Sequence, residues 1–236
     1  MAEILCSICA RGGSKGLKNK NIKKINDLEL IAYSIYQAKN SKLFKHIVVS
    51  TDSDEIMSVA KKHGACVFFK RDKKLALDSA AKLPVIRDCF LRSEKYFNTT
   101  FDYAIDLDAT APLRSSKDIK DAFNLFVKSG KENLISVTKA RKSPYFNQVE
   151  LKESGEVRLC KKSLVKRRQD SPKVYDMNAS IYIFKRNRLL KSDILFGKKT
   201  ALFVMNDDTA FDIDNELDFK IVEFLIKEKN LKIKDL

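Results

Sequence analysis

The residues best suited to chemistry form a loop that follows the first apolar run of the sequence. This run ends at Ala10, and residues 11–21 read Arg-Gly-Gly-Ser-Lys-Gly-Leu-Lys-Asn-Lys-Asn. Glycines let backbone N–H groups approach an anion closely, and Arg11, Lys15 and Lys20 add positive charge at three spaced positions. The loop therefore predicts a cradle for a polyphosphate. The alternative is an ordinary turn with solvated lysines.

Two common nucleotide loops do not fit this spacing. A P-loop would place Gly-Lys-Ser/Thr at a fixed distance from an earlier glycine, and a dinucleotide fold would show G-x-G-x-x-G. Residues 10–21 contain neither pattern. ATPase and dehydrogenase functions therefore have no support in this loop.

Two aspartate doublets, Asp106 with Asp108 and Asp212 with Asp214, each lie at the end of an apolar run. Residues two apart on a strand share one face, so each doublet can direct two carboxylates at one place. Mg²⁺ typically takes one or two carboxylates together with phosphate oxygens of a substrate. Beside a phosphate loop, the doublets predict a metal-assisted reaction at phosphorus. Asp214 could equally cap the helix expected after it.

Cysteine and histidine offer little for other chemistries. The five cysteines show no zinc or disulfide spacing, and two histidines are too few for a metal cluster. Cys6 and Cys9 form a C-x-x-C inside an apolar run, where residues three apart face opposite sides of a strand. We interpret them as buried thiols of a reduced, cytoplasmic protein.

The elements that must position these residues alternate along the chain as short apolar runs and amphipathic stretches of helical length. Strands are expected at residues 4–10, 47–51, 65–69, 103–108, 134–138, 180–184 and 201–205, and helices at 30–40, 54–63, 80–96, 116–128 and 215–229. Asp52 with Glu55 and Ser115 with Asp118 have capping-box spacing. This alternation predicts an α/β fold, with a Rossmann-like, mainly parallel sheet and flanking helices.

The alternation breaks between residues 139 and 173, where short strand-like pieces replace it. This stretch holds eleven basic and four acidic residues, which supplies nearly half of the net charge of +15. We predict a core built from residues 1–138 and 176–236, with residues 139–175 inserted as a small subdomain.

The basic excess would suit nucleic acid, an anionic membrane or a polyanionic small substrate. Lysine outnumbers arginine by 35 to 11, whereas base readers and bidentate phosphate clamps favour arginine. The chain also shows no zinc-finger or RNA-binding signature, and no apolar run as long as a membrane span. We therefore expect no nucleic-acid partner and no membrane.

Several motifs together resemble the acylneuraminate cytidylyltransferases, the CMP-sialic acid synthetase family. Residues 10–22 are similar to the signature A-R-G-G-S-K-G-x-P-x-K-N-I, with Lys18 in place of the proline. Further matches follow in order over nearly the whole chain: Ser50-Thr51-Asp52, Arg71, Asp78-Ser79-Ala80, Thr110-Ala111-Pro112-Leu113-Arg114, Arg168-Gln169, Asn178-Ala179-Ser180-Ile181-Tyr182 and Phe211-Asp212-Ile213-Asp214. Within the family, the chain looks most like the bacterial CMP-legionaminate synthases.

The resemblance implies a nucleotidyltransferase fold whose insertion is a dimerisation segment, and so a homodimer. It implies transfer of CMP from CTP to a nine-carbon α-keto acid sugar, with release of pyrophosphate and with Mg²⁺ or another divalent cation. The sugar would be legionaminic acid or an N-acyl derivative, used in bacterial surface or flagellin glycosylation. Sialic acid, pseudaminic acid or a D-x-D glycosyltransferase reaction are the alternatives.

The resemblance also assigns the site residues. Lys20, Asp212 and Asp214 would be catalytic, and the two aspartates would hold the metal. The nucleotide would contact Arg11, Gly12, Gly13, Ser14, Lys15, Asn21, Arg71 and Ala80. The sugar acid would contact Asp108, Arg168, Gln169, Asn178, Tyr182 and Phe196.

Besides Lys18, two positions depart from the family. Asp108 stands where the sialic acid enzymes commonly have Gln, which would mean a changed sugar contact or an additional metal ligand. Lys82 stands where some relatives have Ser. It could add a cation near the phosphates or merely solvate a helix, and we favour the solvated helix.

Overall fold

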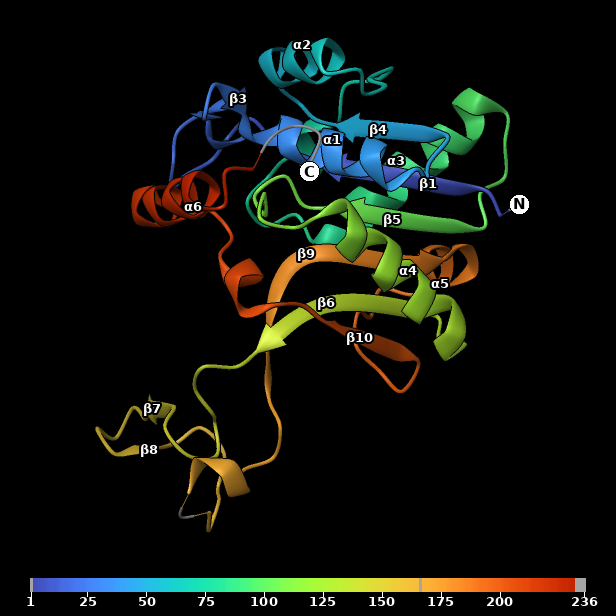
Figure 1. Ribbon diagram of the computed structural model, residues 1–236. Helices are drawn as coiled ribbons and strands as arrows, with labels where there is room; N and C mark the ends of the chain where they lie inside the picture. Colours follow the sequence, from blue (N-terminus) through green and yellow to red (C-terminus); the bar gives the residue numbers. More distant parts are fainter. Residues whose placement is uncertain (1, 166, 232–236) are drawn as a thin grey trace.

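A six-stranded sheet lies at the centre of the molecule (Figure 1). The computed structural model describes residues 2–165 and 167–231, and at residue 168 the backbone alone. The spatial order is β10-β6-β9-β5-β1-β4. The strands are β1 (Ile4–Cys9), β4 (His46–Ser50), β5 (Tyr103–Leu107), β6 (Asn133–Lys139), β9 (Tyr175–Lys185) and β10 (Thr200–Val204). Neighbouring strands are parallel except at β9, which runs antiparallel to β5 and β6. The mainly parallel α/β sheet is confirmed.

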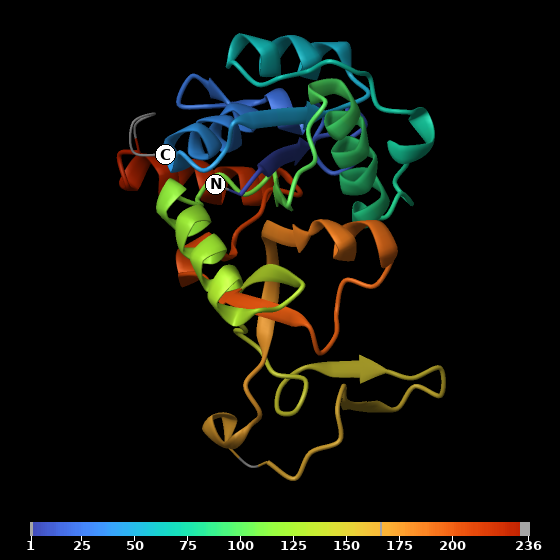
Figure 2. The ribbon, with the colours of Figure 1, turned by 90° about the vertical axis from the view of Figure 1, so that its right-hand side faces the viewer.

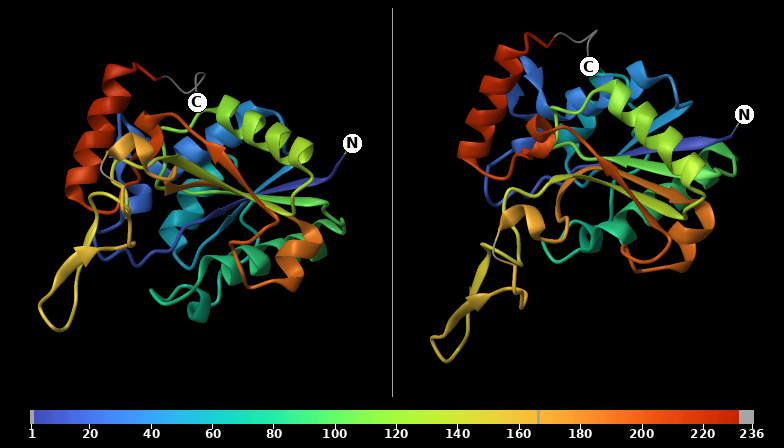
Figure 3. Two further views of the ribbon diagram at one scale, coloured as in Figure 1. Left: turned by 90° about the horizontal axis from the view of Figure 1, so that it is seen from below. Right: turned by 60° about the horizontal axis from the view of Figure 1, so that its bottom comes forward.

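Helices cover both faces of the sheet (Figure 3, left). One face carries α1 (Leu30–Ser41), α2 (Asp54–Lys62) and α4 (Ser116–Ser129), and the other carries α3 (Lys82–Phe97) and α5 (Arg186–Lys191). Side chains along β1 point alternately to the two faces of the sheet. Cys6 and Ile8 pack with α1 and α4 on one face, while Leu5 packs with α3 on the other. A strand buried on both faces explains the continuous apolar run in the sequence.

The C-terminal helix, α6 (Glu216–Glu228), packs in a third cluster with the small hairpin β2 (Lys24–Ile25) and β3 (Leu28–Glu29). Asn215 caps α6 and forms a capping box with Asp218. Asp214 is therefore not the helix cap, which resolves the alternative left open by the sequence. The capping box of Ser115 with Asp118 at α4 is confirmed.

Two local expectations were wrong. Residues 65–69 do not form a strand: Cys66 makes a single bridge to Val48, and the chain then leaves the sheet. Asp52 does not cap α2, because Ser53 accepts the hydrogen bond from the Ile56 N–H. The carboxylate of Asp52 instead accepts a hydrogen bond from the Gly12 N–H at 2.9 Å, which ties the first loop to the end of β4.

Residues 140–174 leave the sheet between β6 and β9 and project away from it (Figures 1 and 2). This arm carries the hairpin β7 (Val149–Leu151) and β8 (Val157–Leu159) and the short turn η3 (Arg168–Asp170). Among the described residues, every helix is too short or too polar to cross a bilayer.

Candidate active site

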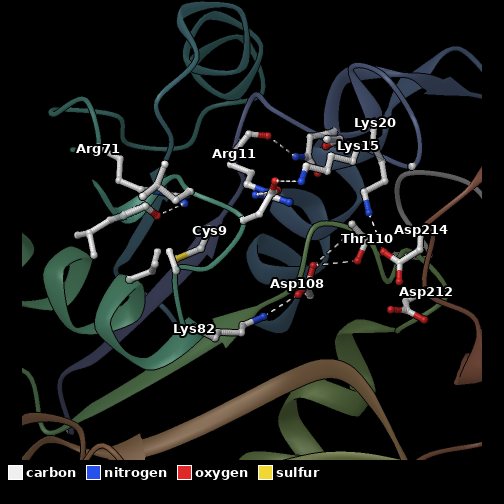
Figure 4. A pocket seen from close by; sticks show the side chains of 18 residues that line it. Cys9, Arg11, Lys15, Lys20, Arg71, Lys82, Asp108, Thr110, Asp212 and Asp214 are labelled. Carbon is white, nitrogen blue, oxygen red and sulfur yellow. Dashed lines mark hydrogen bonds and ion pairs between the residues drawn. The ribbon is translucent and has the colours of Figure 1, made fainter. Parts of the chain in front are cut away.

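A cavity of about 530 Å³ opens at the carboxyl ends of β1, β4 and β5 (Figure 4). Because these strands are parallel, the loops that follow them meet at one edge of the sheet. The lining residues are Cys9, Arg11, Ser14, Lys15, Gly16, Lys20, Asn21, Arg71, Leu75, Leu77, Asp78, Ala80, Lys82, Val85, Asp108, Thr110, Asp212 and Asp214. The structure thus brings the glycine-rich loop together with both aspartate doublets.

Contacts to its backbone hold the loop after β1 in place. The buried Asn21 donates a hydrogen bond to the Arg11 carbonyl at 3.0 Å, which closes the loop across its base. Gly16 lies directly against the last aspartate doublet, since a Cβ added there would come within 2.2 Å of the Asp214 carbonyl oxygen. Gly12 and Gly13 belong to the loop but do not line the cavity.

Asp78 holds two of the loop's cations. Its carboxylate pairs with the Arg11 guanidinium and, at 2.6 Å, with the Lys15 ammonium. The hydrogen bond from Lys15, together with Arg11, keeps the pKa of Asp78 below its usual value. An internal anion therefore occupies the place where the sequence predicted a polyphosphate.

The third cation of the loop contacts the second doublet. Lys20, in the turn η1 (Lys20–Ile22), donates to the Ile213 carbonyl at 2.5 Å and to Asp214 Oδ1 at 2.9 Å. Burial and the neighbouring Asp214 carboxylate raise the pKa of Asp212. Both carboxylates line the cavity, so both are accessible to a ligand there.

The two carboxylates of the Asp212–Asp214 doublet are the residues that could hold a divalent cation. Within residues 2–165 and 167–231, no three His, Cys, Asp or Glu side chains gather as a metal centre. Two carboxylates completed by substrate oxygens are a donor set that Mg²⁺ takes and that a structural zinc site does not.

The first doublet is engaged differently. The ammonium of Lys82, at the start of α3, lies 2.6 Å from Asp108 Oδ2 and 3.2 Å from Asp106 Oδ2. Burial alone would raise the pKa of Asp108, but Lys82 and the Thr110 hydrogen bonds hold it at about 2. The preference for a solvated Lys82 was therefore wrong, because its side chain points into the cavity (Figure 4).

Arg71 is built into the cavity wall. Its guanidinium donates hydrogen bonds to the Ser50 hydroxyl at 3.1 Å and to the Ser50 carbonyl. A further hydrogen bond of 3.4 Å reaches the carbonyl of Leu75, the last residue of the short helix η2 (Lys73–Leu75). It therefore joins the end of β4 to the segment that carries Asp78. Ala80 lies on the same segment and lines the cavity, two residues before α3 begins.

The residues expected to contact the sugar, as far as their side chains are described, lie at several places in the single chain. Asp108 lines the cavity, and Tyr182 lies buried beneath Lys82, whose ammonium is 4.4 Å from the ring centroid. Gln169 lines a second cavity of about 560 Å³ at the base of the arm. Phe196 is exposed between α5 and β10 and lines neither cavity. The side chain of Arg168 lies outside the described part of the structure.

The sugar contact expected of Asn178 stays a prediction, and its side chain is buried. It is 2% exposed, accepts a hydrogen bond from the Ser136 hydroxyl at 2.7 Å, and donates one to the Thr209 carbonyl at 3.2 Å. Its amide is thus used inside the protein, where β9 passes the turn η4 (Asp207–Ala210). It does not line the cavity.

Seven cavity residues were not among the predicted contacts: Cys9, Gly16, Leu75, Leu77, Asp78, Val85 and Thr110. Gly16 stands in the predicted loop and Thr110 in a recognised motif, so position alone could have identified them. Asp78 also stands in a recognised motif, but nothing in the sequence places it opposite Arg11. Burial raises the pKa of the Cys9 thiol, as expected for a thiol that stays protonated.

Comparisons with known proteins find relatives along nearly the whole chain. Residues 5–234 match the family model described as cytidylyltransferase. The chain is 66% identical, over all of both chains, to "CMP-N,N'-diacetyllegionaminic acid synthase" of Campylobacter jejuni, and 65% identical, also over all of both chains, to "Post-translational flagellin modification protein B" of Campylobacter coli. A pseudaminic acid cytidylyltransferase of Campylobacter jejuni is 34% identical over 94% of this chain and 96% of its own.

Among solved structures, a CMP:2-keto-3-deoxy-manno-octonic acid synthetase complexed with CTP superposes with a TM-score of 0.69. The superposition covers 97% of this chain and 100% of the synthetase chain, and the two sequences are 14% identical. At that identity the likeness concerns the fold, which is that of a nucleotidyltransferase.

Proposed function

The chain belongs to the cytidylyltransferase family and is a CTP-dependent nucleotidyltransferase, and from this premise we propose that it transfers CMP from CTP to legionaminic acid or an N-acyl derivative. The products would be the CMP-sugar and pyrophosphate. The observation that carries the choice of sugar is the 66% identity to a CMP-N,N'-diacetyllegionaminic acid synthase, against 34% to a pseudaminic acid cytidylyltransferase. The similarity to a flagellin modification protein supports a role in glycosylation of flagellin or of the cell surface.

The cavity suits the triphosphate of CTP. Arg11, Lys15 and Lys20 converge on it from one loop, and backbone N–H groups of that loop can approach a phosphate closely. We infer that phosphate oxygens take over Arg11 and Lys15 from Asp78 when CTP binds. Arg71, Asn21 and Ala80 line the same cavity and would face the cytidine.

The chemical step would be in-line attack of the anomeric hydroxyl on the α-phosphorus. Positioning and charge stabilisation supply most of the catalysis in such a reaction. Asp212 and Asp214 would hold a divalent cation, which, when bound, neutralises charge on the reacting phosphate. Lys20 lies 2.9 Å from Asp214, so its ammonium can orient that carboxylate and meet the departing pyrophosphate.

The arm supports a homodimer. Apolar side chains of the arm face solvent in the single chain, including Val149, Leu151, Val157 and Leu164. An isolated two-stranded hairpin is also only marginally stable in water. We propose that a second copy covers this face, and that Arg168 and Gln169 reach the partner's sugar site. The five free thiols are consistent with a cytoplasmic location.

A substrate panel tests the proposal. The purified protein, CTP and Mg²⁺ are incubated with legionaminic, pseudaminic or sialic acid, and pyrophosphate and CMP-sugar are both measured. We expect the highest kcat/KM with a legionaminic acid. Pseudaminic or sialic acid as the preferred substrate would overturn the assignment of the sugar, and no pyrophosphate with any acid would overturn the reaction itself.

Asp212→Asn tests the role of the second doublet. Replacing a carboxylate that holds the cation should lower kcat by at least about 100-fold, the size of effect seen when a charge-stabilising group is removed. The melting temperature should change little, because the Asp212 side chain faces the cavity. Unchanged turnover would remove this carboxylate from the mechanism.

A further inference from the structure

The first aspartate doublet already holds a cation, and that cation belongs to the protein. Lys82 Nζ lies between one oxygen of each aspartate, 2.6 Å from Asp108 Oδ2 and 3.2 Å from Asp106 Oδ2. Two carboxylates two residues apart on a strand end were the arrangement that the sequence associated with a metal ion. In the structure, an ammonium group stands at the point where they converge.

The remaining oxygens of the doublet are taken up or buried. Asp106 is 0% exposed, and its Oδ1 accepts a hydrogen bond from the Ser7 hydroxyl at 2.7 Å. Its Oδ2 has no hydrogen-bond partner apart from the ion pair with Lys82. Asp108 Oδ1 accepts from the Thr110 N–H at 3.1 Å and from the Thr110 hydroxyl at 2.9 Å. A buried carboxylate without the nearby ammonium would be left uncompensated.

The ammonium is held from other sides as well. The Tyr182 ring lies 4.4 Å below it, a distance at which a cation is attracted to the ring face. The stem of Lys82 leaves the first residue of α3, which fixes where the side chain starts. The second doublet has no comparable occupant, since Lys20 reaches one oxygen of Asp214 and Asp212 lines the cavity.

We propose that Lys82 is a built-in cation that occupies the Asp106–Asp108 doublet in place of a metal ion, so that divalent metal binds at Asp212 and Asp214 alone. The ammonium reduces the charge of this doublet from −2 to −1 without any dissolved ion. The triphosphate can then approach the cavity wall with less repulsion at any metal concentration. Lys82 thus acts as a positioning residue through the two carboxylates it holds.

The experiment counts bound Mn²⁺ per chain by electron paramagnetic resonance titration of the whole protein. Lys82→Met should bind one Mn²⁺ more than the wild type, because the doublet becomes free. Lys82→Arg, which keeps a cation, and the double variant K82M/D108N, which removes one carboxylate, should both return to the wild-type count. Lys70→Met is the matched control, since it removes an exposed lysine that pairs with Asp54 at 2.6 Å and does not line the cavity.

The count also separates this inference from the proposed function on which it rests. A wild type that binds no Mn²⁺ would contradict the proposed metal site at Asp212 and Asp214, while a gain of one ion in K82M would still support the role of Lys82. An unchanged count in K82M would overturn the inference.

Melting temperature provides the second readout. Mn²⁺ should raise the melting temperature of K82M more than that of the wild type or K82R. A K82M chain that folds only with Mn²⁺ would also support the inference. A chain unfolded with and without Mn²⁺, while K82M/D108N folds, would show that Lys82 is a counter-ion that no metal can replace, and would overturn it.

Discussion

At the scale of single residues, Asp78 is the group that most directly opposes ligand binding. Its carboxylate is paired with Arg11 and Lys15, two cations that the loop would offer to a triphosphate. In the proposed binding mode, CTP would have to break both pairs before it could contact these side chains. The pairs are partly exposed, so their strength depends on ionic strength.

Asp78→Asn is therefore expected to lower the KM for CTP by a few-fold at low salt. The amide keeps the shape of the side chain but no longer competes as an anion for Arg11 and Lys15. The difference from the wild type should shrink as salt rises, because salt screens the exposed pairs. Initial rates at varied CTP and two salt concentrations measure both effects.

Asp54→Asn provides the control for Asp78, because it removes an exposed carboxylate that pairs with Lys70 and does not line the cavity. Its KM for CTP should equal that of the wild type. A higher KM in D78N would show instead that Asp78 holds the two cations in their binding positions.

The loop cations and the carboxylates of the second doublet could be predicted from their types and spacing. Their partners could not, because an ion pair such as that of Arg11 with Asp78 depends on how two distant loops meet. Lys82 illustrates the same point: on a helix it has the pattern of a solvated lysine, and only the fold brings the first residue of α3 to Asp108, just after β5. Asn178 fits the motif but is buried by the path of β9.

At the scale of elements, the first loop and the segment before α6 are fitted together at Gly16. A Cβ there would come within 2.2 Å of the Asp214 carbonyl oxygen, a backbone atom that cannot move aside alone. Gly13, in the same loop, would meet nothing within 4 Å. The glycine at position 16 is thus required by a close approach, and the one at position 13 is not.

Gly16→Ala should separate the loop from Asp214 and so pull Lys20 away from the carboxylate it contacts. We expect a fall in kcat of about 10- to 100-fold, since misplacing a positioning group by about 1 Å has effects of that size. The melting temperature should fall by a few degrees. Steady-state kinetics and thermal unfolding monitored by circular dichroism measure the two effects.

Two glycines serve as controls for this variant. Gly13→Ala should keep the wild-type melting temperature, and Gly197→Ala, outside the cavity and also without a neighbour within 4 Å, should keep both stability and activity. A G16A enzyme with normal kinetics would contradict the close fit of loop and doublet.

The junction of α1 and α2 contains a buried acid. Glu29 is 7% exposed. Its carboxylate accepts a hydrogen bond from the Lys62 ammonium at 3.0 Å and shares another with the His63 ring at 2.8 Å. Burial alone would raise its pKa, but Lys62, the backbone and His63 lower it to about 2. A group whose pKa is lowered in the folded state stabilises the protein above its unfolded pKa of about 4.5 and loses this effect as the pH falls toward about 2.

Glu29→Gln should destabilise the protein at pH 7 by about 2 kcal/mol, the usual size for a hydrogen bond to a charged group. The difference from the wild type should shrink between about pH 4.5 and pH 2, where the wild-type carboxylate takes up a proton. Urea unfolding at several pH values measures it. Glu223→Gln, which breaks an exposed pair with Lys227, should show almost no effect.

The elements themselves were predictable where the hydrophobic pattern is strong. The strands β1, β4, β5 and β6 were expected close to their observed bounds. Parallel strands buried on both faces appear in the sequence as continuous apolar runs. Residues 65–69 read the same way but do not form a strand, since the chain leaves the sheet after the bridge at Cys66 to bring Arg71 beneath β4. Apolar character reports burial, and pairing depends on the path of the chain.

At the scale of the whole molecule, the sugar-contacting residues predicted from the motifs are divided between two regions. Asp108 lines the main cavity, whereas Gln169 lies at the base of the arm and lines a different one. Neither of these two cavities is lined by both groups. A symmetric dimer would bring the arm of one copy to the cavity of the other, since each surface that contacts the partner is present twice.

Complementation between two inactive variants tests this arrangement. Asp212→Asn disables the core of its own chain but leaves its arm intact, and Arg168→Ala disables the arm but leaves the core. When both chains are co-expressed in equal amounts, half of the dimers contain one of each, and each such dimer has one complete site, so about a quarter of the wild-type activity should return. Light scattering measures whether the chains form dimers. As a control, D212N co-expressed with Asp214→Asn, where both changes lie in the core, should recover no activity. Absence of recovery with D212N and R168A, in chains shown to form mixed dimers, would place the whole sugar site within one chain.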